Sequence, residues 1–260
     1  MARATFYYHF KRLYTQDKHA DLRSRVIDIY HQHHGRYGYR RITLALRNES
    51  IVVNHKTVER LMRECGLKSQ VRIKKYRSYR GQPGKIVPNV LQRNFKVAEP
   101  NRKWATDVTE FSMFGRKKYL SPIMDLYNGE IISYTLSDHP DLAMVTSMLG
   151  KALKDIDKNS KLVLHSDQGW HYQNATYQKM LSDKDVIQSM SRKGNCLDNA
   201  AMENFFGILK SELLYLQKFS SMEEFSAELK KYIKYYNNDR IKAKLKGMSP
   251  VNYRTHSSKI

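Results

Sequence analysis

The stretch from Asp198 to Leu213, DNAAMENFFGILKSEL, constrains the fold of this chain more than any other. Apolar residues recur in it at helical spacing and form one stripe: Met202, Phe205, Phe206, Leu209 and Leu213. On the shoulder of this stripe Glu203 and Lys210 lie within about 20° of each other, near Asn199. A rise of about 1.5 Å per residue separates the carboxylate from the ammonium by about 10 Å, too far for mutual neutralisation. The pattern predicts a helix with one buried face and two free charges of opposite sign. An ordinary amphipathic helix also has charged flanks, so other carboxylates must decide whether the charges are functional.

The net charge indicates a polyanionic partner. The chain of 260 residues holds 46 Lys and Arg against 25 Asp and Glu, a formal net charge of +21. Nucleic acid is the first candidate, and a basic ribosomal or membrane-surface protein is the alternative. Residues 1–100 carry +15 and residues 101–260 carry +6, so binding is expected mainly in the first part. With only two cysteines, far apart, and no signal peptide or long apolar run, we expect a soluble protein of a reducing cytosol.

Residues 1–67 are expected to form a helical helix-turn-helix DNA-binding domain. Its last helix begins at Asn54, a favourable N-cap residue, and ends at Gly66. One face of that helix is apolar and the opposite face is basic, which is typical of a recognition helix. A solvated basic face on a small helical bundle would have the same pattern. The residues expected to contact DNA are Lys56, Arg60 and Arg63 on this helix and Arg40 and Arg41 before it.

Residues 68–98 are expected to form a basic linker. The segment from Lys68 to Lys85, KSQVRIKKYRSYRGQPGK, holds seven basic residues and no acidic one. Its glycines and proline disfavour a helix and favour an extended path along a phosphate backbone, although a flexible tether would have the same composition. The cations expected to contact DNA here are Lys74, Lys75, Arg77 and Arg80.

From Trp104 the chain becomes rich in β-prone segments. WATDVTEF, KYLSPIMDL and EIISYTL are separated by turn residues, and LVLHSDQG and VIQSM follow with helical stretches between them. Three consecutive strands and then alternating helices and strands predict an α/β fold with a mixed five-stranded sheet flanked by helices. We expect the all-α domain to precede this fold and residues 217–260 to form a helical basic tail.

Three carboxylates could share a metal site. Asp107 lies midway along the first expected strand, Asp167 at the end of the fourth, and Glu203 on the helix. Two-metal phosphoryl transfer needs hard oxygen ligands that converge from separate rigid elements, and Mg²⁺ suits such ligands. The 18 acidic residues of this half allow many other triples. Asp125 is the closest rival, expected to be a polar sheet residue with a supporting role possible, and Asp198 is expected to cap its helix.

Several motifs together resemble one family. WATDVTEF, LHSDQG and DNAAMENFFGILKSE resemble, in that order, the three catalytic blocks of DDE transposases in the retroviral-integrase superfamily. The 35 residues between Asp167 and Glu203, and a lysine seven positions after the glutamate, also match that pattern. GRYGYRRITLAL and YNNDRIKAKLKGMSPVNY resemble flanking signatures of the OrfB products of the insertion-sequence-three family. The resemblance covers nearly the whole chain.

The resemblance implies an RNase H-like integrase core over residues 99–216. Asp107 would bridge two Mg²⁺ ions, for which Mn²⁺ could substitute, while Asp167 and Glu203 would each complete one ion site. The implied reaction is strand cleavage at the terminal inverted repeats of an insertion sequence, followed by joining of the 3′-hydroxyl to target DNA. Lys210 and Asn199 would hold the element-end DNA near the metals.

The same resemblance implies the partners. They are double-stranded DNA, further copies of this chain in at least a dimer, and a product of an upstream frame (OrfA), which supplies another helix-turn-helix and a coiled coil. A cytoplasmic, nucleoid-associated bacterial protein without a membrane partner is expected. Two alternatives stay open: a DNA-binding regulator whose enzymatic half is silent, and a nuclease or resolvase on the same fold. A nucleophilic tyrosine among the 18 tyrosines is not excluded by counting.

Overall fold

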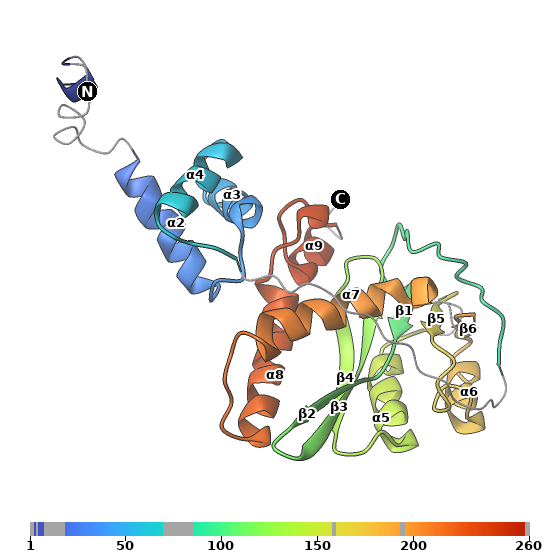
Figure 1. Ribbon diagram of the computed structural model, residues 1–260. Coiled ribbons are helices and arrows are strands. Elements are labelled where there is room, and N and C mark those ends of the chain that lie inside the picture. Colours follow the sequence, from blue (N-terminus) through green and yellow to red (C-terminus); the bar gives the residue numbers. More distant parts are fainter. Residues whose placement is uncertain are drawn as a thin grey trace. The chain divides into compact units, whose positions relative to one another are not determined.

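The computed structural model describes residues 3, 5–7, 19–69, 86–157, 160–192 and 196–257, in two compact units, Met1–Gln70 and Val71–Ile260 (Figure 1). Most of residues 1–18 lies outside the described residues. So does most of the basic segment, including the four cations expected to contact DNA there, Lys74, Lys75, Arg77 and Arg80.

Within residues 19–69 the first unit contains three short helices, α2 (Ala20–Gln32), α3 (Tyr39–Asn48) and α4 (His55–Glu64). Their apolar faces meet in a small core of Val26, Ile29, Ile42, Leu46, Val58, Leu61 and Met62. The expected cap of α4 is confirmed, since Asn54 Oδ1 accepts a hydrogen bond from the Lys56 backbone N–H at 2.9 Å. That bond satisfies one of the amide groups that a helix start leaves without a partner.

The second unit contains a mixed sheet. Its described strands are β1 (Lys103–Thr106), β2 (Thr109–Met113), β3 (Arg116–Asp125), β4 (Ile131–Ser137), β5 (Val163–Ser166) and β6 (Ile187–Met190). Strand β3 pairs antiparallel with β1, β2 and β4, whereas β1, β5 and β6 run parallel to one another. The expected mixed sheet flanked by helices is confirmed.

The sheet has six described strands where five were expected, because the first expected strand is interrupted. Thr106 pairs with Ile123 and Thr109 pairs with Leu120, so both pieces keep a single register on β3. Asp107 and Val108 form the interruption, and Asp107 Oδ1 accepts a hydrogen bond from the Val108 backbone N–H at 2.7 Å. A side chain that bonds to its own neighbouring backbone competes with the pairing of the strand.

Helices cover both faces of the sheet (Figure 1). On one face α5 (Leu142–Leu153) and α6 (Ala175–Ser182) pack on Trp104 and Ile123; on the other, α7 (Ala200–Leu209) and α8 (Met222–Asn238) pack on Ala105 and Met124. Consecutive strand residues point to opposite faces, so neighbours such as Trp104 and Ala105 belong to different cores. All five residues of the expected apolar stripe are buried: Met202, Phe205, Phe206, Leu209 and Leu213.

The C-terminal segment completes the second core. After α7 a π-helical turn covers Lys210–Leu214, and α8 adds Phe225, Leu229, Ile233 and Tyr236 to the same cluster. A short 3₁₀ helix (Ala243–Leu245) and α9 (Pro250–Ser257) follow. The segment expected to be a tail therefore contributes buried side chains to the sheet's second face.

Candidate active site

Two aspartates lie side by side where two parallel strands end. Ala105 of β1 pairs with His165 of β5, and on each strand the aspartate follows two residues later, as Asp107 and Asp167. Neighbouring strands lie about 4.8 Å apart, so this register brings the two carboxylates to one edge of the sheet. Asp107 was expected midway along a strand. It lies immediately after β1, in the interruption between β1 and β2, where its backbone takes no part in strand pairing.

Local hydrogen bonds orient both carboxylates. Asp167 Oδ1 accepts a bond from the Gly169 backbone N–H at 2.8 Å, and Asp107 Oδ2 accepts one from Asn199 Nδ2 at 3.0 Å. Gly169 permits the close approach, since a Cβ there would lie 2.9 Å from Asp167 Oδ1. The second bond crosses from β1 to the start of α7 and fixes the helix that carries Glu203 against the sheet.

The electrostatic environment opposes ionisation of the pair. Burial raises the pKa of Asp107 well above its usual value; the negative charge of Asp167 raises it further and that of Glu203 adds to this, while the Val108 N–H and the Lys210 ammonium act in the opposite direction. Burial also raises the pKa of Asp167, against the Gly169 N–H and His171. The hydrogen bonds to the two carboxylates come from the Val108 and Gly169 backbone N–H groups and the Asn199 amide. These neutral donors leave the repulsion between two neighbouring carboxylates in place.

Glu203 and Lys210 stand close enough to act on Asp107 through their charges, and both are half-buried. The Lys210 Nζ lies 5.6 Å from the centroid of the Phe111 ring, at the point where α7 changes to a π-helical turn. Among the described residues, however, no three His, Cys, Asp or Glu side chains are near enough to one another to hold a metal ion. The fold brings Asp107 and Asp167 together, and Glu203 acts on Asp107 through its charge.

The donors present fit a hard divalent cation in chemical type. Asp107, Asp167 and Glu203 supply carboxylate oxygens, which Mg²⁺ prefers. The Asn199 side-chain oxygen, Oδ1, is buried and has no hydrogen-bond partner in the described part of the chain. Because a buried polar atom without a partner is costly, an additional group that coordinates or donates to this oxygen would stabilise the site. A cation would also offset the repulsion between the carboxylates.

Two of the residues singled out in the sequence have other positions than expected. Asn199, expected to contact DNA, is 5% exposed and lies against Asp107. Asp198, expected to cap α7, does not do so: Asn199 is the residue at the helix start, and Asp198 accepts hydrogen bonds from Arg93 and Arg192 instead. Neither arginine was identified from the sequence: Arg93 lies 105 residues from Asp198, and for Arg192, six residues before it, no helical or strand period indicated the contact.

Asp125, the rival carboxylate, belongs to a different part of the sheet. It pairs with Trp104, near the start of β1, whereas Asp107 follows its end. Its carboxylate is fully buried, accepts N–H groups of Asn101 and Tyr127, and forms an ion pair with Arg254 of α9. These contacts tie α9 to the sheet and leave Asp125 outside the acidic pair.

Tyr172 is a neighbour of the pair that the sequence did not indicate. It is buried, and its pKa is raised well above the usual value by burial first and then by the charges of Asp107 and Asp167. Its ring also lies 3.3 Å from where a Cβ of Gly169 would be. One wall of the site is therefore aromatic.

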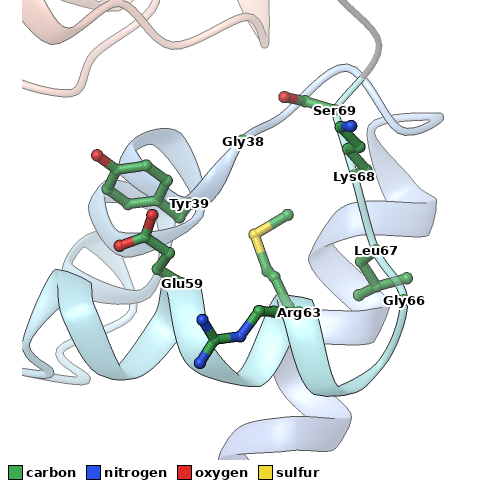
Figure 2. A pocket seen from close by; sticks show the side chains of 9 residues that line it. Gly38, Tyr39, Glu59, Arg63, Gly66, Leu67, Lys68 and Ser69 are labelled. Atoms are coloured by element: carbon green, nitrogen blue, oxygen red, sulfur yellow. The ribbon is translucent and has the colours of Figure 1, made fainter.

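In the first unit, the basic side chains expected to contact DNA lie mostly at the surface. Lys56, Arg60 and Arg63 on α4 and Arg40 on α3 are exposed, while Arg41 is half-buried against the Tyr37 ring. Arg60 lies 3.7 Å from Glu64, an exposed pair of little energetic weight. Figure 2 shows a pocket beside this surface whose lining includes Tyr39 of α3 and Glu59, Met62 and Arg63 of α4. The unit thus presents a basic helix face beside a concave one.

Comparisons with known proteins add family information. Residues 97–196 and 203–257 match two family models that are each described as an integrase core domain, and residues 17–75 match an HTH-like domain. None of the described helices has the length and apolar character needed to span a membrane.

Curated relatives match almost all of the chain. The putative transposase InsK for insertion sequence element IS150 of Escherichia coli (strain K12) is 54% identical over 98% of this chain and 90% of its own length. The probable transposase for insertion sequence element IS1353 of Shigella flexneri is 37% identical over 98% of this chain and 50% of its own length. Among solved structures, the HTLV-2 integrase catalytic core domain in complex with magnesium has a TM-score of 0.50 at 18% identity. It covers 61% of this chain and 99% of its own, and shows the likeness of fold.

Proposed function

The chain belongs to the insertion-sequence-three family of transposases, and from this premise we propose that it cuts and joins DNA at the ends of such an element. The reaction proposed is metal-dependent strand cleavage at the terminal inverted repeats, followed by transfer of the 3′-hydroxyl to target DNA. One observation carries the proposal: Asp107 and Asp167 follow adjacent parallel strands, with pKa values raised by burial, and Glu203 and Lys210 act on Asp107 from the helix across the edge.

Asp107, Asp167 and Glu203 would hold Mg²⁺, in two ions per site, and Mn²⁺ would substitute. When bound, such ions activate a water or a 3′-hydroxyl as nucleophile and stabilise the leaving oxygen. The chain's own groups would position the reactants. Asn199 holds the Asp107 carboxylate in one orientation, and the Lys210 ammonium would bind a phosphate of the element end at the rim of the site.

The two units would have different roles in the reaction. We propose that residues 1–67 bind the terminal repeats, that residues 68–98 follow the DNA backbone as a linker, that residues 99–216 carry the chemistry and that 217–260 support it. The match of residues 17–75 to an HTH-like domain supports the first assignment. The same proposal includes assembly into at least a dimer on DNA, pairing with an upstream-frame OrfA product, and a cytoplasmic, nucleoid-associated location. Co-purification with that product, and sedimentation with and without DNA, would test the first two.

The test replaces each acid by its amide. Asp107→Asn, Asp167→Asn and Glu203→Gln should each reduce cleavage and joining of an end-containing duplex in Mg²⁺ to the level without enzyme, because each removes a charged oxygen ligand while leaving the side chain's size unchanged. Binding of the same duplex should persist. Glu110→Gln, at an exposed position of β2, is the matched control and should keep full activity. Joining activity retained by any of the three variants would reject the assignment.

A DNA-binding regulator with a silent catalytic half is the second candidate. It is favoured by the position of Glu203, which does not join the aspartates in a three-ligand group. A nicking assay over a Mg²⁺ titration separates the two: DNA binding without nicking at any concentration would favour the regulator. Cutting of branched DNA without joining would instead indicate a resolvase.

A further inference from the structure

The Asp198 carboxylate accepts hydrogen bonds from two segments that are far apart in the sequence. It is fully buried, and it accepts bonds from Asn89 Nδ2 at 2.9 Å and Arg93 Nε at 2.8 Å, both before β1. From the segment after β6, Arg192 donates its backbone N–H at 3.1 Å, Nε at 3.0 Å and Nη2 at 3.1 Å. A charged acceptor with this many donors holds each of them in a defined orientation.

The two arginines nevertheless face solvent. Their side chains are 43% exposed for Arg93 and 60% exposed for Arg192. Both donate to Asp198 Oδ1, at 2.8 and 3.1 Å, so their guanidinium groups lie side by side. The Arg93 guanidinium donates to the carboxylate through Nε, and the Arg192 guanidinium donates through Nε and Nη2. Within the described residues, the other N–H groups of the two guanidinium groups have no protein acceptor. Because two guanidinium groups share one carboxylate, the cluster has a net positive charge. Its remaining N–H donors face solvent.

Two hydrogen bonds place this cluster next to the acidic pair. Asn199, the residue after Asp198, donates to Asp107. Gln168, the residue after Asp167, donates its side-chain Nε2 to the backbone oxygen of Ser191, which precedes Arg192, at 3.0 Å. Asp107 is thus connected to the cluster through one side chain and one step along the chain, and Asp167 through one side chain and two steps. A DNA strand whose scissile phosphate met the aspartates would have its neighbouring phosphates near the arginines.

We propose that Arg93 and Arg192, held in place by Asp198, form a preorganised clamp for a backbone phosphate of the DNA strand that enters the acidic site. The planar guanidinium presents paired N–H groups that match two phosphate oxygens. A carboxylate that fixes such groups in advance lowers the conformational entropy that binding would otherwise cost. Asp198 acts here as a positioning residue. The inference rests on the proposed function, because it takes DNA as the substrate.

The test measures how DNA affinity depends on salt. Full-length protein is titrated into a fluorescein-labelled duplex of mixed sequence, and the logarithm of the association constant is plotted against the logarithm of the salt concentration. Removal of one cation that binds a phosphate should make the slope shallower by about 0.9. Arg93→Gln and Arg192→Gln remove the charge but keep a side-chain N–H for Asp198, so they should fold and still show this change. Arg116→Gln, which alters an exposed arginine paired with Glu223, is the matched control and should leave the slope unchanged.

The outcomes separate the clamp from a purely structural tie. Unchanged slopes in both glutamine variants, with normal melting temperatures, would overturn the clamp. If a glutamine variant melts early, Arg93→Lys and Arg192→Lys replace it: they keep the charge, so a retained slope together with weaker binding supports the clamp, and unaltered affinity overturns it. Wild-type protein that binds DNA with the expected slopes but never cuts would contradict the proposed function and leave the clamp standing.

Discussion

At the scale of single residues, the Asp107–Asp167 pair costs the folded chain free energy while both carboxylates are ionised. Burial and the neighbouring charge raise the pKa of Asp107 above its value in the unfolded chain. Stability from this group is therefore complete below the usual carboxyl pKa and is lost as the pH rises through the raised value. An enzyme that needs both charges keeps this instability until a cation compensates it.

Asp107→Asn should remove that pH-dependent loss. The variant is expected to have a higher free energy of unfolding than the wild type near pH 8, and the difference should vanish below the ordinary carboxyl pKa of about 4. Thermal melting over this range in metal-free buffer measures it. Mg²⁺ should then raise the melting temperature of the wild type more than that of the variant. Parallel pH curves for the two proteins would contradict the assigned cause.

Gly169→Ala should displace the Asp167 carboxylate. The added Cβ would lie 2.9 Å from Asp167 Oδ1 and 3.3 Å from the Tyr172 ring, so one of these groups must shift. Strand cleavage should fall by about 10- to 100-fold, because displaced ligands lose metal affinity and alignment. Gly150→Ala is the matched control, since the nearest atom to its Cβ would be a flexible methyl carbon of Met180 at 3.7 Å. Equal activities of the two variants would show that the position of this carboxylate does not limit the reaction.

At the scale of elements, the π-helical turn after α7 places the charged side chain of Glu212 in the core on the second face of the sheet. Glu212 is buried there and accepts bonds from Arg240 Nε at 2.7 Å, Arg240 Nη2 at 2.6 Å and Tyr232 hydroxyl at 2.9 Å. Burial opposes the Arg240 charge, but the Glu212 carboxylate outweighs it and raises the pKa of the guanidinium. The helix that carries Glu203 and Lys210 is thus tied to the segment after α8.

Arg240→Ala should destabilise the protein strongly, because it leaves the Glu212 charge buried without its partner. We expect a loss of about 3–5 kcal/mol in urea unfolding monitored by circular dichroism. The exposed ion pair of Arg116 with Glu223 provides the comparison, and Arg116→Ala should cause no measurable loss. Similar stabilities for both variants would mean that Glu212 is protonated or hydrated.

At the scale of the whole molecule, charge and chemistry are separated along the chain. The first 100 residues carry a net charge of +15 and the remainder +6, so the basic residues are concentrated before the strands that hold the acids. The acidic pair lies in the second unit, and the exposed basic face of α4 lies in the first. Long-range attraction of DNA is therefore expected to depend mainly on residues 1–100.

Lys56→Ala should weaken DNA binding without altering the site. If the ammonium contacts a phosphate, the salt dependence becomes shallower by about 0.9 for every DNA sequence; if it contacts a base, discrimination between sequences falls by about 1–3 kcal/mol. Fluorescence anisotropy on repeat and non-repeat duplexes distinguishes these results. Lys151→Ala, an exposed lysine on α5, serves as the control. Unchanged binding after Lys56→Ala would argue for a solvated face.

The sequence by itself determined the local features: the buried stripe from Met202 to Leu213, the start of α4 at Asn54, and the mixed sheet with helices on both sides. These follow from side-chain periodicity and capping, which act over a few residues. Only the tertiary structure decided that Asp107 interrupts a strand, that Asn199 is buried against it, and that Asp198 binds two arginines. The Asp107–Asn199 and Arg93–Asp198 contacts join residues 92 and 105 positions apart, which only the fold brings together, and no local pattern predicts them.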